Sequence, residues 1–112
     1  MVKVTCIVRP HKLEEVKTAI ANVGVTGMSV SDVRGRGNSE EKAVWFGGQE
    51  ILVALPIKSK IVVVVPDELA ELVVQSVLQS AKTGEAGDGK IFLEPVSDAI
   101  RIRTLERGEV AV

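Results

Sequence analysis

Hydrophobic and polar positions alternate along the chain in a way that predicts six elements. Runs rich in Val and Ile that stop at Pro or Gly are typical of strands. Apolar residues spaced by three and four positions indicate amphipathic helices. The predicted elements, in order, are a strand at 2–8, a helix at 13–23, a strand at 25–33, a strand at 61–65, a helix at 69–81 and a strand at 91–96. Asp67 follows Pro66 and is predicted to cap the second helix.

The two halves of the chain share one sequence pattern, V-x-P-x-x-L-x-E followed by an apolar residue, at 8–16 and again at 64–72. A duplicated strand–helix–strand unit predicts an α+β fold of the ferredoxin-like βαββαβ type. Four antiparallel strands would carry both helices on one face of the sheet. The other face, rich in Val and Ile, would need a partner, so we expect a homo-oligomer.

Composition narrows the class of protein further. With 112 residues, 46% of them hydrophobic, the chain is expected to form a single domain over 1–112. Its net charge of −1 predicts no global attraction to nucleic acid or a membrane surface, and no apolar run approaches the length of a membrane span. The lone cysteine, Cys6, fits a reducing compartment, and we expect a cytoplasmic protein.

Three segments could bind phosphate. Thr83–Lys90 combines three glycines with a lysine, which lets backbone N–H groups and a positive charge approach an anion; a plain turn explains it as well. Arg101 and Arg103 would lie on one side of an extended segment and suit phosphate, or a solvated strand edge. The Gly35–Gly37 segment is a third approach point or a simple loop entry.

No set of residues predicts catalysis. His11 has no metal-ligating or catalytic neighbour and is interpreted as a surface or capping residue, and Cys6 as a small buried apolar residue. Nothing assembles a nucleophile, a base and an orienting group, so we expect neither an enzyme nor a metal centre.

Several motifs together resemble one family. The run T-G-E-A-G-D-G-K-I-F at 83–92 is accompanied, in order and spacing, by R-P-H-K-L-E-E-V-K at 9–17, V-T-G-M-S-V at 25–30, V-R-G-R-G at 33–37 and I-R-I-R-T at 100–104. These motifs cover nearly the whole chain and closely resemble the PII (nitrogen regulatory P-II) signalling proteins.

The resemblance implies a homotrimer that binds ATP or ADP in clefts between subunits. It implies a T-loop at about 37–55, a B-loop at about 82–90 and a C-terminal loop at about 101–112. A regulated transporter, enzyme or regulator of nitrogen metabolism would bind the T-loop, with Trp45 and Phe46 as candidate contacts unless Trp45 packs on its own loop. The implied nucleotide-binding residues are Ile7, Ser29, Gly35, Gly37, Val64, Gly87, Asp88, Gly89, Lys90, Arg101 and Arg103.

The T-loop departs from the family pattern. The chain contains no tyrosine, so uridylylation of a T-loop tyrosine is impossible, and Gln49 stands where cyanobacterial members carry a phosphorylated serine. Lys58 matches the lysine that helps hold 2-oxoglutarate, but Ser39 replaces the glutamine that contacts magnesium and this effector. The acidic run after Ser39 would repel a dicarboxylate. We therefore expect a mobile T-loop and a weak response to 2-oxoglutarate and Mg²⁺.

Two other functions stay open. A PII-like sensor could combine the same nucleotide site with bicarbonate or a cyclic nucleotide in carbon or transport regulation. A ferredoxin-like domain could also bind nucleic acid by stacking bases on aromatic side chains, but the predicted strands carry almost none.

Overall fold

The structure is a computed structural model that describes residues 1–37, 43–46, 50–53 and 55–112, with the backbone alone for 43–46 and 50–53. Its elements are β1 (Val2–Val8), the 3-10 turn η1 (Pro10–Lys12), α1 (Leu13–Asn22), β2 (Ser29–Arg34), β3 (Ala43–Phe46), β4 (Glu50–Val53), β5 (Ile57–Val65), α2 (Asp67–Ala81), β6 (Gly89–Pro95) and the 3-10 turn η2 (Gly108–Ala111).

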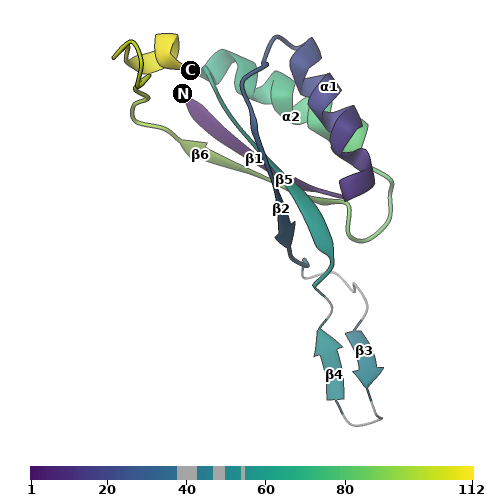
Figure 1. Cartoon of the computed structure of the whole chain (residues 1–112). Helices are drawn as coiled ribbons and strands as arrows, with labels where there is room; N and C mark the ends of the chain where they lie inside the picture. Colours follow the sequence, from purple (N-terminus) through teal and green to yellow (C-terminus); the bar gives the residue numbers. More distant parts are fainter. Residues whose placement is uncertain (38–42, 47–49, 54) are drawn as a thin grey trace.

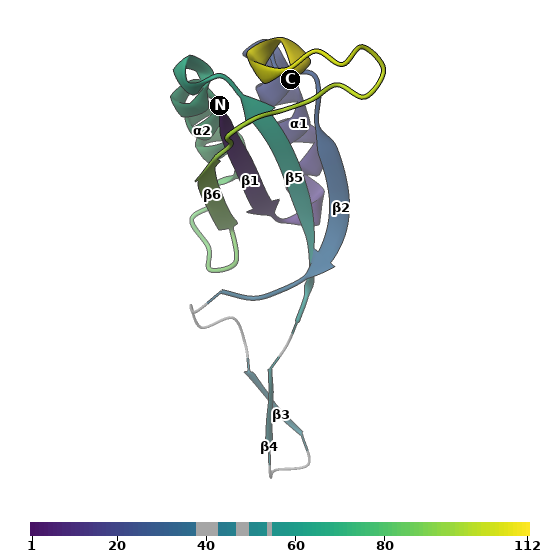
Figure 2. The ribbon, with the colours of Figure 1, turned by 90° about the vertical axis from the view of Figure 1, so that its left-hand side faces the viewer.

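Four of the strands form one antiparallel sheet in the order β2-β5-β1-β6. Both α-helices cover the same face of this sheet, and the opposite face is open (Figures 1 and 2). This is the predicted ferredoxin-like α+β arrangement, which is confirmed. The registers Val8↔Ser59 and Val8↔Gly89 bring the end of β1 beside the start of β6 and the first half of β5.

The core lies between the sheet and the helices because alternate strand residues point to the helical face. In β1 these residues are Val4, Cys6 and Val8, all fully or almost fully buried. They pack with one apolar stripe from each helix and with the odd-numbered residues of β5. The other buried residues of this cluster are Val16, Ile20, Val25, Ile61, Val63, Val65, Val73, Val77 and Ala81.

Two strand starts differ from the prediction by four residues, while the other strand ends agree within two. Val25 is buried, but it lies outside the sheet, and its N–H donates to the Ile20 carbonyl at the end of α1 (3.4 Å), so β2 begins only at Ser29. β5 begins at Ile57, four residues before its apolar run, because Lys58 pairs in register with Val33 of β2. Strand pairing rather than hydrophobicity determines both boundaries.

The predicted cap on α2 is also wrong. The N-cap residue is Pro66, and no side chain caps the helix; Asp67 is the first helical residue. Its carboxylate lies 3.0 Å from the amino group of Met1. A carboxylate in the first turn still suits the positive end of the helix dipole.

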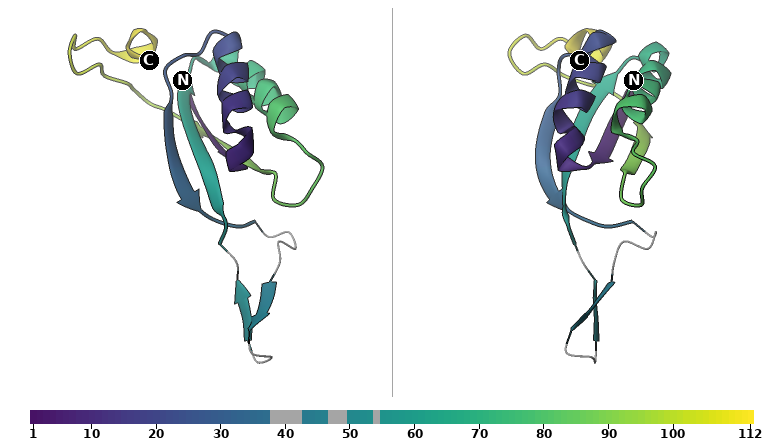
Figure 3. Two further views of the ribbon diagram at one scale, coloured as in Figure 1. Left: turned by 45° about the vertical axis from the view of Figure 1, so that its right-hand side comes forward. Right: turned by 90° about the vertical axis from the view of Figure 1, so that its right-hand side faces the viewer.

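Between β2 and β5 the chain forms a second, two-stranded sheet. Ala43 pairs with Val53 and Phe46 with Glu50 in an antiparallel ladder between β3 and β4. Neither strand was predicted, because both lie in the segment interpreted as a loop. The hairpin extends beyond the end of the main sheet where β2 ends and β5 begins (Figures 1 and 3).

Candidate functional site

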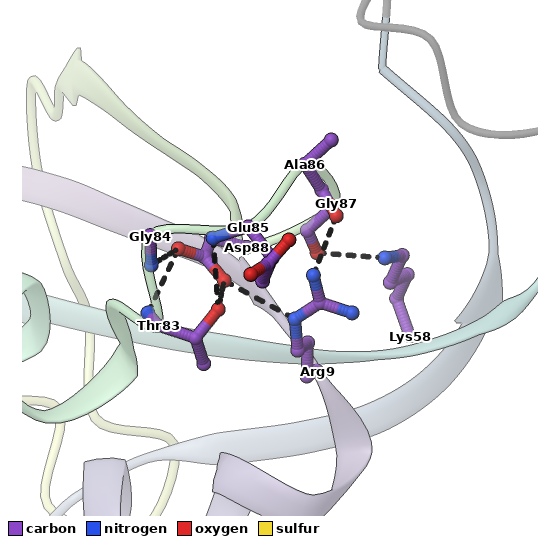
Figure 4. A network of polar contacts seen from close by, with 8 residues as sticks. All are labelled: Arg9, Lys58, Thr83, Gly84, Glu85, Ala86, Gly87 and Asp88. Carbon is purple, nitrogen blue, oxygen red and sulfur yellow. Dashed lines mark hydrogen bonds and ion pairs between the residues drawn. The ribbon is translucent and has the colours of Figure 1, made fainter.

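The B-loop, residues 82–90, connects α2 to β6 and is held by one carboxylate. Asp88 Oδ2 accepts the backbone N–H groups of Thr83 (2.8 Å) and Gly84 (2.9 Å), while Oδ1 accepts the Thr83 hydroxyl and Nε of Arg9 (3.1 Å). Figure 4 shows these contacts converging on Asp88. The carboxylate therefore closes the loop on itself and ties it to the end of β1.

The same donors change the acidity of Asp88. The hydroxyl of Thr83, followed by the two backbone N–H groups and Arg9, holds the pKa of the Asp88 carboxyl well below its ordinary value, against a smaller opposing effect of burial. Asp88 is therefore ionised at neutral pH, with four donors around its charge.

Two basic side chains bind neighbouring carbonyl groups of the loop. Nη2 of Arg9 donates to the Ala86 carbonyl, and Nζ of Lys58 donates to the Gly87 carbonyl at 2.8 Å (Figure 4). Lys58 is only 6% exposed, so its contact with the loop is shielded from water. The B-loop is thus held from both β1 and β5.

Gly89 lies where no other residue fits. Its φ is +113°, and a Cβ atom built on it would lie 1.7 Å from the carbonyl oxygen of Ile7. Gly87 also has a positive φ, +97°. These glycines let the loop turn and let β6, which begins at Gly89, pass directly against β1.

A cavity of about 660 Å³ opens between the B-loop, the end of β2 and the start of β5. The charged side chains of its described lining are mostly basic, with five cationic and two acidic groups: Arg34, Arg36, Lys58, Lys60 and Lys90 against Glu85 and Asp88. Ile7, Val33 and Phe92 supply an apolar part. Basic groups, a glycine loop and an apolar wall suit an anionic ligand with an apolar portion.

The predicted nucleotide-binding residues separate into two groups. One group lines this cavity: Ile7, Gly35, Gly37, Gly87, Asp88, Gly89 and Lys90, together with the predicted effector residue Lys58. The other group, Ser29, Val64, Arg101 and Arg103, is absent from the described lining. Val64 pairs with Lys3 near the opposite end of the sheet, and the C-terminal segment follows β6 at that end (Figure 2).

The predicted extended arginine pair is wrong. Residues 102–104 form a turn, and Leu105 at its end has a positive φ of +64°. Arg101 forms an ion pair with Glu106 (3.0 Å) and donates to the Val110 carbonyl (3.0 Å). A local turn competes with extension here because these contacts close the segment on itself.

Several residues of the site were not predicted individually. Arg34 and Lys60 line the cavity, Arg36 lines it within the predicted Gly35–Gly37 segment, and Arg9 holds the loop behind it. The sequence signal for Arg36 was its place between Gly35 and Gly37; Arg9 carried none, because its partners lie 77 and 79 residues away.

The remaining candidates have simple positions. Cys6 is buried, and burial raises the pKa of its thiol to about 11, as expected of an apolar core residue. His11 is exposed in η1.

Ser39 and the side chains of Trp45 and Phe46 lie outside what the structure describes. In the described ranges, no cluster of three or more His, Cys, Asp or Glu side chains could hold a metal, and neither α-helix has the length and hydropathy to cross a membrane.

Fold and cavity together define a ferredoxin-like domain whose glycine loop opens on a basic pocket. The family model described as Nitrogen regulatory protein P-II matches residues 1–106. Over all 112 residues the chain is 46% identical to a nitrogen regulatory protein P-II of Nostoc punctiforme and 41% identical to nitrogen regulatory protein P-II 1 of Escherichia coli, covering 100% of each. It is 45% identical to nitrogen regulatory protein P-II 2 of Methanothermobacter thermautotrophicus, covering 97% of that relative.

The chain therefore belongs to the nitrogen regulatory protein P-II family, and the resemblance noted from its motifs is confirmed. Its relatives are named as regulatory proteins, which supports a role in signal transduction.

Proposed function

We propose that this protein senses ATP and ADP in the basic cavity and relays its occupancy to a partner protein through the segment 37–55. The observation that carries the proposal is the B-loop itself, a glycine loop closed by Asp88 whose residues Gly87–Lys90 line a cavity of about 660 Å³. This volume lies within the usual range of small-molecule sites, roughly 300–1,000 Å³.

Electrostatics favours a phosphorylated ligand. Five basic side chains face two acidic ones in the described lining, and the carboxylate of Asp88 already accepts four hydrogen bonds. Its negative charge is thus partly compensated, so the cavity retains a positive field. Charge-assisted contacts from Lys90 and from loop N–H groups would hold the phosphates, and Ile7 would contact the apolar part.

The site is complete only with a second copy of the chain. Val64, Arg101 and Arg103 belong to the end of the sheet remote from the B-loop, and β1, with seven residues, separates the two ends by about 20 Å. Ser29 lies halfway along the sheet, because its partner Val62 is opposite Thr5 in the middle of β1. A homotrimer would bring the C-terminal segment of one subunit to the B-loop of the next. It would also cover the sheet face without helices, where Phe92, paired with Thr5 rather than with the core residues of β1, is 50% exposed.

The signal would pass through the stem of the hairpin. The cavity is lined by Gly35–Gly37, where the chain leaves β2, and by Lys58, where it has entered β5. A ligand there would contact the chain on both sides of the hairpin, at Gly35–Gly37 and at Lys58. Its binding energy could therefore select one position of the hairpin. A change in the order or position of a loop is a recognised switching mechanism. A transporter, enzyme or regulator of nitrogen metabolism would bind the hairpin in one of its positions and not in the other.

Calorimetry and light scattering on the purified protein test the proposal. We expect about three times the chain mass of 12.0 kDa, and ATP and ADP binding that weakens about ten- to a hundred-fold in Lys90→Ala and in Arg103→Ala. Lys17→Ala is the matched control, because Lys17 pairs with Glu14 on α1. A monomer, or unchanged affinity in both site variants, would contradict the proposal.

A second function shares the site. Lys58 is engaged with the Gly87 carbonyl and almost fully buried, so a second effector would have to compete for it. The contact weighs against 2-oxoglutarate, for which the resemblance implies Lys58 as a ligand, and leaves bicarbonate or a cyclic nucleotide as the alternative second signal. Calorimetry with each compound in the presence of ATP separates these alternatives.

A further inference from the structure

We propose that Arg9 is a positioning residue for the nucleotide site: its guanidinium, outside the cavity, holds the B-loop in its ligand-binding shape. The inference rests on the proposed function and deepens it. It assigns to a side chain at the end of β1 the task of shaping a loop nearly eighty residues further along the chain.

The side chain of Arg9 holds the B-loop through two hydrogen bonds. Its Nε lies 3.1 Å from Asp88 Oδ1, and Nη2 donates to the Ala86 carbonyl, so both bonds end in the B-loop (Figure 4). Its own backbone is fixed, because the carbonyl of Arg9 accepts the N–H of Lys12 at 3.0 Å in η1. The side chain is 24% exposed, and Arg9 is absent from the described lining of the cavity. Arg9 therefore contacts the loop and not the space where a ligand would bind.

The hydrogen bond from Arg9 to the Ala86 carbonyl also fixes the orientation of the peptide group between Ala86 and Gly87. In a trans peptide the N–H of one residue points opposite to the carbonyl of the residue before it. Because the Ala86 carbonyl points to Arg9, the N–H of Gly87 points away from Arg9, and Gly87 lines the cavity. Arg9 thus fixes the direction of this N–H, which is the donor that our proposal assigns to a bound phosphate.

The same contact controls charge. Asp88 lines the cavity as well, and an unpaired carboxylate there would repel a phosphate. The ion pair between Arg9 and Asp88 offsets this charge and keeps the carboxylate bonded to the N–H groups of Thr83 and Gly84.

Arginine is required because one guanidinium makes both bonds. A lysine ammonium is a single point donor on a flexible stem, so it can serve Asp88 or the Ala86 carbonyl more easily than both. Arg9→Lys should therefore fall between the unmutated protein and Arg9→Met.

The test compares Arg9→Met, Arg9→Lys, Asp88→Asn and the double variant Arg9→Met/Asp88→Asn with the full-length protein. Amide hydrogen exchange without nucleotide reports on the N–H groups of Thr83, Gly84 and Glu85, which bond inside the loop. Calorimetry with ATP and with ADP reports the affinity, and thermal unfolding reports the global fold. Lys17→Met, which removes an equal charge from α1, is the control.

We expect Arg9→Met to accelerate exchange at these three amides and to weaken both nucleotides by about tenfold, with unfolding nearly unchanged. The double variant should be less affected than the two single effects combined, since both side chains act through one contact. Equal exchange and equal affinity in Arg9→Met and Lys17→Met would overturn the inference. If the unmutated protein binds neither nucleotide, the proposed function fails, while exchange still decides whether Arg9 holds the loop.

Discussion

Gly89 is the position where one methyl group should damage the site most. Alanine would place its Cβ 1.7 Å from the carbonyl oxygen of Ile7 and 2.8 Å from the carbonyl carbon, whereas Cβ atoms essentially never come within 3.0 Å of another heavy atom. The neighbour is backbone inside the sheet, so it cannot rotate away. The start of β6 would have to move from β1 by more than an ångström.

Two contributions determine how much Gly89→Ala lowers the free energy of unfolding. A positive φ in a residue with a side chain costs about 1–2 kcal/mol. Separating the Gly89↔Val8 end of the ladder loses one or two backbone hydrogen bonds, each worth about 1 kcal/mol. The sum, about 2–4 kcal/mol, is below the roughly 5–15 kcal/mol by which native domains are stable. Gly89→Ala should therefore remain folded with its B-loop displaced.

Urea unfolding and ATP calorimetry on three alanine variants measure this. Gly84 has a φ of +92°, and no atom lies within 4 Å of the place where an alanine methyl group would be, so Gly84→Ala should show the backbone cost alone. Gly27 has open space and no positive φ, so Gly27→Ala should be close to neutral. Gly89→Ala should lose the most stability and bind ATP at least tenfold more weakly, since Lys90 moves with it. Stability and ATP affinity equal to those of Gly27→Ala would refute the reasoning.

Three further predictions follow from single residues. The pKa of Asp88 is lower in the folded protein than the ordinary Asp value of about 3.9, so the ionised carboxylate stabilises the fold above that pH. This stabilisation is lost as pH falls toward the folded-state pKa. Hydrogen-exchange protection of the B-loop amides should therefore stay constant from neutral pH to about 4 and decline below it. Cys6 has no exposed surface and a thiol pKa of about 11, so a thiol reagent at pH 8 should label it only after unfolding; fast labelling of the native protein would contradict its burial. Titrating 2-oxoglutarate into the MgATP complex should produce little heat and little change in Trp45 emission, and tight micromolar binding that requires ATP would show that Ser39 replaces the family's glutamine without loss.

Much of the B-loop site was predictable from local sequence. Gly87, Gly89 and Lys90 form a contiguous motif, and glycine and lysine have direct consequences for backbone freedom and charge. Arg9 and Lys60 were not predictable, since Arg9, just after β1, and Lys60, in β5, reach the site from segments distant from the B-loop in sequence. The extended Arg101–Arg103 pair failed for a related reason: its conformation depends on contacts with Glu106 and Val110 that the local pattern does not specify.

The fold, like the site, has features that local sequence predicts and features that depend on partners distant in sequence. Periodicity alone determined the order of the four main strands and two helices, together with the apolar stripe of each helix, because burial of one face imposes a repeat of two in a strand and of three to four in a helix. Strand ends, the β3–β4 hairpin and the cavity depended on pairing between distant segments: Lys58 belongs to β5 because Val33 lies opposite it, and the cavity exists because β2, β5 and the B-loop converge. A residue's own chemistry is local, but its partners are chosen by packing and hydrogen bonding across the whole chain, so only the tertiary structure decided which charges meet.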